Sequence, residues 1–280
     1  MKFYFSVLFA IAFSLCAGSV YAQNKIVKHP TLGKHQIIDK SIIDCIYEHI
    51  CYDPILDETR IVDEILEIGT NSSRYGDYGI YRRDSVVRKD YPNQEMDFNE
   101  FRELGHKYER SGDNAELIKY TAENKMVNYQ RIFLDVYFYE EKIPDFQWTL
   151  IDGSDEICNY NCKKATMDFR GRKWTAWYCE DIQSDNGPWK FGGLPGLILK
   201  LEDEKHEHIF EAMQIRKGCK EFGFKLRSLQ IKTTREKFNE MMADFRINIR
   251  SFLLNNPQAP TAPGGTPLPK RMFYNPVELN

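Results

Sequence analysis

Two histidines have the type and spacing that metal chemistry requires. His206 and His208 stand two positions apart, so a β-strand would point both imidazoles to one face, as two metal ligands need. They also fall at the polar end of a hairpin for which we predict Glu204-Lys205 as the loop. We favour a solvated hairpin tip, and therefore predict no metal ligand and no cofactor.

A second group combines aromatic and basic side chains. Arg172, Trp177 and Trp189 could line a ligand cleft, with the indoles supplying apolar contact and the guanidinium pairing with an anion. Trp174 belongs on the opposite face from Trp177, because an odd number of positions separates them. We favour a structural interpretation, in which the tryptophans are core residues and Arg172 clamps a loop, since aromatic residues in strands usually serve packing.

Motifs for nucleophilic or metal-assisted catalysis are absent from the sequence. It has no Gly-x-Ser-x-Gly, no His-Glu-x-x-His and no phosphate-binding loop. A triad dispersed along the chain would leave no such motif, because its groups meet only in space. We predict no catalytic residue and favour a non-enzymatic protein, with a secreted hydrolase such as a peptidase as the alternative.

The N-terminus has the features of a cleaved secretory signal. Lys2, an apolar run over residues 3–16 and the site Val20-Tyr21-Ala22 predict a signal peptide of residues 1–22. A membrane anchor is the competing interpretation, but the run is short of the roughly 20 residues that a spanning helix needs. We expect an exported protein in the periplasm or at the cell surface, with no transmembrane segment after cleavage. The net charge of −3 gives no basic surface for nucleic acid.

Six of the seven cysteines follow the predicted cleavage site. An even number in an exported chain favours disulfides over zinc. If Arg170-Gly171 is a two-residue hairpin loop, Phe169 faces Arg172, and counting outward places Cys162 opposite Cys179. Facing cysteines can bridge where the geometry permits, so we predict a Cys162–Cys179 disulfide.

The elements that would position these groups are mostly strands. Short turn-rich connections join antiparallel neighbours and predict a meander. Capping boxes at Asp97 and at Thr233-Thr234 predict two helices, of which the second has an apolar stripe. We predict an α+β fold in which a largely antiparallel curved sheet carries this C-terminal helix on one face. The predicted strands are 41–50, 127–139, 146–151, 157–169, 173–181, 197–202, 208–215 and 224–231, and 61–68 fits either a strand or a helix.

The densest local signal is the glycine- and proline-rich stretch that precedes residue 197. Leu194-Pro195-Gly196-Leu197 fits a type II turn, and Gly193, Pro195 and Gly196 are its predicted structural residues. The turn leads into a strand that, with the Glu204-Lys205 loop, would place Leu201 opposite His208. Residues 23–256 are predicted to form one domain, and 257–280 a Pro-rich tail that acts as an extended tether.

The sequence resembles the GLPGLI family, exported proteins of unknown function typical of Bacteroidota. The resemblance is carried by Phe169-Arg170-Gly171-Arg172, by residues 174–178, by residues 187–199 with Gly193 to Ile198 at their centre, and by the terminal Asn275-Pro276-Val277-Glu278-Leu279. It implies export and supplies no catalytic residue. Ile182-Gln183 departs from the family pattern.

We therefore expect a non-enzymatic envelope protein that binds a ligand or partner or acts in assembly. An aromatic-rich sheet closed by a helix could enclose an apolar small molecule. A partner in the outer membrane could instead dock on the tail or on residues 275–279.

Overall fold

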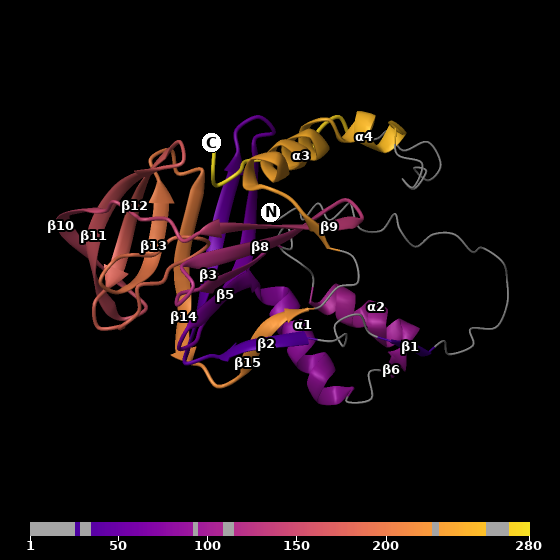
Figure 1. The fold of residues 1–280 in the computed structure, drawn as a ribbon, viewed down its shortest axis with the longest axis horizontal. Helices are drawn as coiled ribbons and strands as arrows, with labels where there is room; N and C mark the ends of the chain where they lie inside the picture. The colour runs from indigo at the N-terminus through magenta and orange to yellow at the C-terminus, as the bar shows by residue number, and fades with distance from the viewer. Residues whose placement is uncertain (1–25, 29–34, 92–94, 109–114, 226–229, 256–268) are drawn as a thin grey trace.

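The computed structural model describes residues 26–28, 35–91, 95–108, 115–225, 230–255 and 269–280. The predicted signal peptide and the first part of the Pro-rich tail lie outside these residues. The described chain is built around a twelve-stranded sheet (Figure 1). None of the described helices has the length and apolarity that crossing a bilayer would require.

The sheet consists of two antiparallel meanders that meet at one strand pair. The first contains β3 (Ile43–Asp53), β4 (Glu58–Ile68), β5 (Ser72–Asp77), β7 (Glu116–Tyr120), β8 (Lys125–Ile132) and β9 (Asp135–Lys142). The second contains β10 (Thr149–Ile157), β11 (Tyr160–Phe169), β12 (Arg172–Cys179), β13 (Leu197–Asp203) and β14 (His208–Lys217). They join where β14 pairs with β3. β16 (Ile231–Lys232) adds a parallel pair to β9, so the sheet is mixed.

Turn chemistry sets the register of the second meander. Arg170 and Gly171 have φ of 47° and 82°, the left-handed pair of a tight hairpin, and Phe169 pairs with Arg172 as predicted. The prediction of Glu204-Lys205 as a two-residue loop is wrong. Asp203 accepts a hydrogen bond from the His208 backbone N–H, which lengthens the loop to residues 204–207 and pairs Leu201 with Phe210. Because the shift is two residues, the same side chains keep the same face.

Two other predicted boundaries are wrong for local reasons. The predicted strand 127–139 is a hairpin of β8 and β9 that turns at Phe133, where φ is 55°. The predicted turn at Asp152-Gly153-Ser154 is an irregularity within β10, and the chain turns instead at Cys158 and Asn159, both with positive φ. The 61–68 segment, which fitted either element, is part of strand β4.

The helices lie outside the sheet. α1 (Tyr78–Asp90) is capped by Asp77, and the sequence did not lead us to predict it. α2 (Phe98–Lys107) begins at the Asp97 capping box as predicted. Residues after the cap at Thr234 form α3 (Arg235–Ile247), which ends at its C-cap Asn248, and α4 (Ile249–Asn255) follows directly. Two small sheets complete the fold: β1 (Ile26–Lys28) with β6 (Glu95–Asp97), and β2 (His35–Lys40) with β15 (Glu221–Lys225).

The core contains three buried clusters. Trp174 and Trp177 belong to different clusters, which agrees with their predicted placement on opposite faces of β12. The third cluster joins α3 to the first meander, because Phe238 and Met242 pack with Ile132 and Tyr139. In Figure 1, α3 and α4 lie at the end of the molecule away from β10.

Candidate functional site

The glycine-rich loop between β12 and β13 fills the core. Phe191 at its centre is fully buried, and its carbonyl accepts a hydrogen bond from Lys119 Nζ at 2.7 Å. Gly193 has φ of 82°, and its N–H donates to the Asp185 carbonyl. The Gly196 N–H donates to Leu194, two residues back, which closes a turn around Pro195 that is tighter than the predicted type II turn. These contacts give the loop a structural role.

Glycine is required at position 196 because two backbone segments approach there. A Cβ atom on Gly196 would lie 2.2 Å from the Cys179 carbonyl oxygen, and φ at this position is 158°. The same approach brings the start of β13 against the end of β12. The stretch thus fixes the separation of two strands that form the middle of the second meander.

Arg172 is a clamp between a hairpin end and the C-terminus. Its guanidinium is almost fully buried and lies 2.7 Å from Asp203 and 2.8 Å from Glu207. It also donates to the Asn275 side-chain oxygen at 2.6 Å and to the Pro276 carbonyl at 2.9 Å. These contacts agree with the clamp interpretation that we favoured for Arg172.

The two tryptophans proposed with Arg172 occupy different environments. Trp177 is buried, and the ammonium groups of Lys164 and Lys200 lie 4.7 and 5.3 Å from its ring. Trp189 lines a cavity, has a φ of 53°, and its buried indole N–H has no hydrogen-bond partner among the described residues. Trp189 packs against the buried cluster that contains Trp177, and of Arg172, Trp177 and Trp189 only Trp189 lines this cavity, so a shared ligand cleft stays a prediction.

Residues 269–280 form a C-terminal strap that packs on the sheet. The buried Asp53 carboxylate accepts from the Tyr274 N–H at 2.8 Å and from Arg271 at 2.9 Å. Asn275 donates to the Tyr52 carbonyl at 2.7 Å. Further along, Glu278 lies 2.9 Å from the buried Lys190 ammonium. The described part of the predicted tether is thus held to the body, because its polar side chains find buried partners.

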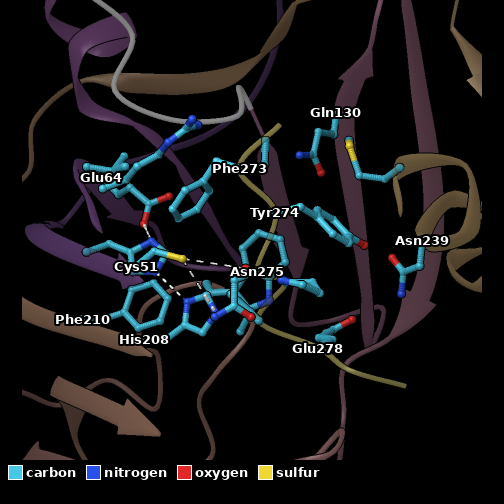
Figure 2. Close-up of a pocket in the computed structure, with 18 of the residues that line it drawn as sticks. Cys51, Glu64, Gln130, His208, Phe210, Asn239, Phe273, Tyr274, Asn275 and Glu278 are labelled. Atoms are coloured by element: carbon cyan, nitrogen blue, oxygen red, sulfur yellow. Dashed lines mark hydrogen bonds and ion pairs between the residues drawn. The ribbon is translucent and has the colours of Figure 1, made fainter. Parts of the chain in front are cut away.

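A cavity of about 160 Å³ lies between the sheet, helix α3 and the strap (Figure 2). The sheet contributes strands β3, β4, β5, β8, β9 and β14, and α3 contributes Phe238, Asn239 and Met242. The strap covers it with residues 273–278. Its walls mix apolar and aromatic side chains with polar and charged ones.

The polar corner of this cavity is built where the two meanders join. His208 on β14 pairs directly with Cys51 on β3, and Phe210 pairs with His49. Alternation along a strand points His49 and Cys51 to one face. His49 Nε2 lies 3.1 Å from His208 Nδ1, and Cys51 Sγ lies 4.0 Å from His208 Nε2. Figure 2 shows Cys51 and His208 beside Asn275 of the strap.

The Glu64 carboxylate orients the His49 ring of this cluster. His49 Nδ1 lies 3.2 Å from Glu64 Oε2, and the Tyr75 hydroxyl donates to the same carboxylate oxygen at 2.6 Å. The carboxylate can only accept, so His49 donates to it through Nδ1. Burial, followed by the nearby His49 and Arg172, holds the pKa of His208 well below 6.5. His208 is therefore a neutral imidazole at physiological pH.

The prediction of a solvated hairpin tip holds for His206 and is wrong for His208. His206 lies exposed in the 204–207 loop, whereas His208 is 1% exposed and faces β3. The longer loop is the cause, because it moves His206 out of the strand. The pattern His49-x-Cys51 was available in the sequence as two ligands on one strand face, but nothing local linked it to His208.

Cys162 and Cys179 are buried at the ends of the paired segments of β11 and β12. The predicted register holds as far as Lys163 opposite Tyr178, one pair short of the two cysteines. Among the described residues the six cysteines carry no disulfide. The bridge therefore stays a prediction.

Fold and cavity together define a β-sheet protein with a small, partly open cavity covered on one side by its own C-terminus. A family model described as a protein of unknown function, Porph_ging, matches residues 169–200, which span the Arg170-Gly171 hairpin and the glycine-rich loop. No curated protein matches the chain.

Two solved structures of PNGF-II, in space groups P21 and C2, are similar with a TM-score of 0.48 and 13% identity. Each match covers 74% of this chain and 34% or 33% of the other, so the chain spans about a third of their length.

Proposed function

We propose that this is an exported envelope protein of the GLPGLI type that binds a small ligand in the cavity beneath the C-terminal strap, without catalysing a reaction. The cavity carries the proposal, because residues from both meanders, α3 and the strap line it. The unpartnered indole N–H of Trp189 adds support, since buried donors in proteins are normally hydrogen-bonded. Export to the periplasm or cell surface rests on the predicted signal peptide.

Native mass spectrometry of the protein purified from its own envelope fraction tests this function. We expect a bound molecule of defined mass. Asn239→Trp should fill the cavity from α3 and remove that mass, whereas Lys237→Trp, at an exposed position on the same helix, should retain it. A wild-type protein without a bound molecule, or equal retention by both variants, would refute the proposal.

A secreted hydrolase is the second candidate, and one observation favours it. Cys51 Sγ and His208 Nε2 are 4.0 Å apart, with His49 and Glu64 behind them, which is the arrangement of a thiol, a base and an orienting group. Against it, Cys51 is 6% exposed and its thiol contacts the Asn275 carbonyl of the strap at 3.8 Å.

Alkylation separates the two functions. Under our proposal iodoacetamide modifies the exposed Cys219 before the covered Cys51, as measured by peptide mass spectrometry. A nucleophilic Cys51 would react first, and its replacement by alanine would abolish a hydrolase activity that Cys219→Ala leaves intact.

An outer-membrane protein partner that docks on the C-terminus is a further proposal from the sequence. The contacts of the strap lead us to expect that deleting residues 269–280 lowers the melting temperature, because Asp53 and Lys190 would lose partners. Loss of a pulled-down partner at an unchanged melting temperature would instead support docking by this end.

A further inference from the structure

The polar corner of the cavity has the donor set of a metal site. His49, Cys51 and His208 each offer one ligand atom, and these atoms all lie within 4.8 Å of one another. All three side chains come from the directly paired strands β3 and β14, so the backbone ladder fixes their separation. A site on paired strands is more rigid than one on loops.

The three side chains lie close enough together to share one ion. Two imidazole nitrogens bound to a tetrahedral zinc at about 2.0–2.1 Å lie roughly 3.3 Å apart, and a nitrogen and a thiolate sulfur roughly 3.5 Å apart. His49 Nε2 lies 3.1 Å from His208 Nδ1, and with one donor atom taken from each residue all three atoms lie within 4.8 Å of one another. The Cys51 sulfur contacts the other ring nitrogen, His208 Nε2, at 4.0 Å, so the histidine pair needs little movement and the thiolate would move by on the order of 1 Å to reach the same ion.

The surroundings supply the outer contacts that metal sites require. A ligating histidine commonly donates its second ring N–H to a carboxylate, which fixes the ring and raises the basicity of the ligand. Glu64 occupies this position behind His49 and is itself held by the Tyr75 hydroxyl. The Asn275 backbone carbonyl lies on the other side of the cluster, so the strap closes over it.

We propose that His49, Cys51 and His208 bind a thiophilic transition-metal ion, zinc(II) or copper(I), at the wall of the cavity. Imidazole and thiolate ligands suit these ions and disfavour magnesium and calcium. Three protein ligands leave a coordination position for a molecule held in the cavity. The inference rests on the proposed binding function and names the metal as part of what this site binds.

Titration of the reduced, metal-free protein tests the site. Calorimetry should show that one Zn²⁺ ion binds per chain. The protein should also take one Cu(I) ion per chain in competition with a chromophoric chelator. Co²⁺ should give a near-ultraviolet thiolate-to-cobalt band, which reports sulfur ligation directly. Cys51→Ser should remove this band and weaken affinity at least tenfold, and Glu64→Gln should weaken it about 10–100-fold by loosening His49.

Matched controls exclude binding by other thiols and histidines. Cys219→Ser and His206→Gln change an exposed cysteine and an exposed histidine, and both should leave stoichiometry and affinity unchanged. Circular dichroism establishes that each variant is folded, and His49→Gln serves as a second ligand variant if Cys51→Ser unfolds. A wild-type protein that binds none of the three ions, or a folded ligand variant that binds them as tightly as wild type, would overturn the inference.

The proposed metal site and the proposed organic ligand can be refuted separately. A protein that carries an organic molecule displaced by Asn239→Trp, but binds no metal, refutes the metal site and leaves the proposed function standing. A protein that binds metal through Cys51, but carries no cavity ligand, confirms the metal site and refutes the broader proposal.

Discussion

Replacing Arg172 with leucine would remove the clamp between hairpin and strap. The side chains of Arg172 and Asp203 are 3% and 2% exposed, so the pair is screened little by water. Removing one member of a buried pair leaves the other as an uncompensated charge and costs about 3–5 kcal/mol. Glu207 is more exposed and should add less. We expect Arg172→Leu to lower the free energy of unfolding by about 3–5 kcal/mol.

Urea unfolding followed by tryptophan fluorescence measures this loss, and the double variant with Asp203→Asn isolates the pair. The double variant should be more stable than the sum of the two single losses predicts, because neither charge is then left alone. The stability of Arg172→Lys should lie between that of wild type and that of Arg172→Leu, since lysine lacks the planar guanidinium that reaches several acceptors. A loss below about 1 kcal/mol, together with loss of a cavity ligand, would refute the clamp and restore the ligand-binding hypothesis for Arg172.

Three other outcomes follow from the same structure. Burial lowers the pKa of Lys119 from 10.5 to about 7, so between these pH values the folded state binds fewer protons than the unfolded chain. In urea unfolding, the stability of wild type relative to Lys119→Met should therefore rise by about 2 kcal/mol between pH 7 and 9. A difference that stays constant with pH would mean that Lys119 titrates normally. Gly196→Ala should lower the free energy of unfolding by about 2 kcal/mol or more, because its Cβ would meet the Cys179 carbonyl. Gly105→Ala is the control: it has open space around it inside α2 and should raise the free energy of unfolding by about 0.5–1 kcal/mol. Equal effects of the two substitutions would contradict the close approach. Peptide mapping of protein from an oxidising compartment should find Cys162 linked to Cys179, and two unmodified thiols there would remove that prediction.

The parts of the fold that could be predicted are those that local chemistry determines. Arg170-Gly171 set a hairpin register that the structure reproduces, and the capping box at Asp97 placed a helix correctly. The Glu204-Lys205 loop failed because a side chain, Asp203, bonds the backbone of His208 and competes with the shorter turn. Such a bond leaves no pattern of polarity in the sequence.

The candidate site could not be predicted because its residues meet only through the pairing of the two meanders. His49 and His208 are 159 positions apart, and their contact exists only because β14 pairs with β3. Each meander is internally local, so turn signals and alternation describe both, yet neither predicts which edges join. The chemistry-bearing residues therefore looked isolated along the chain, and the histidine pair suggested by proximity was the wrong one.

The segments that resemble a known family contact one another in space, and this links the motif to the cavity. Arg170 forms an ion pair with Glu278 of the strap, and its carbonyl accepts from the Leu279 N–H at 2.9 Å. Lys190, from the glycine-rich loop, is fully buried against Glu141 and Glu278. The hairpin and the loop thus hold the strap that covers the cavity. Substitutions in either segment should alter closure of the site even though few of their side chains line it.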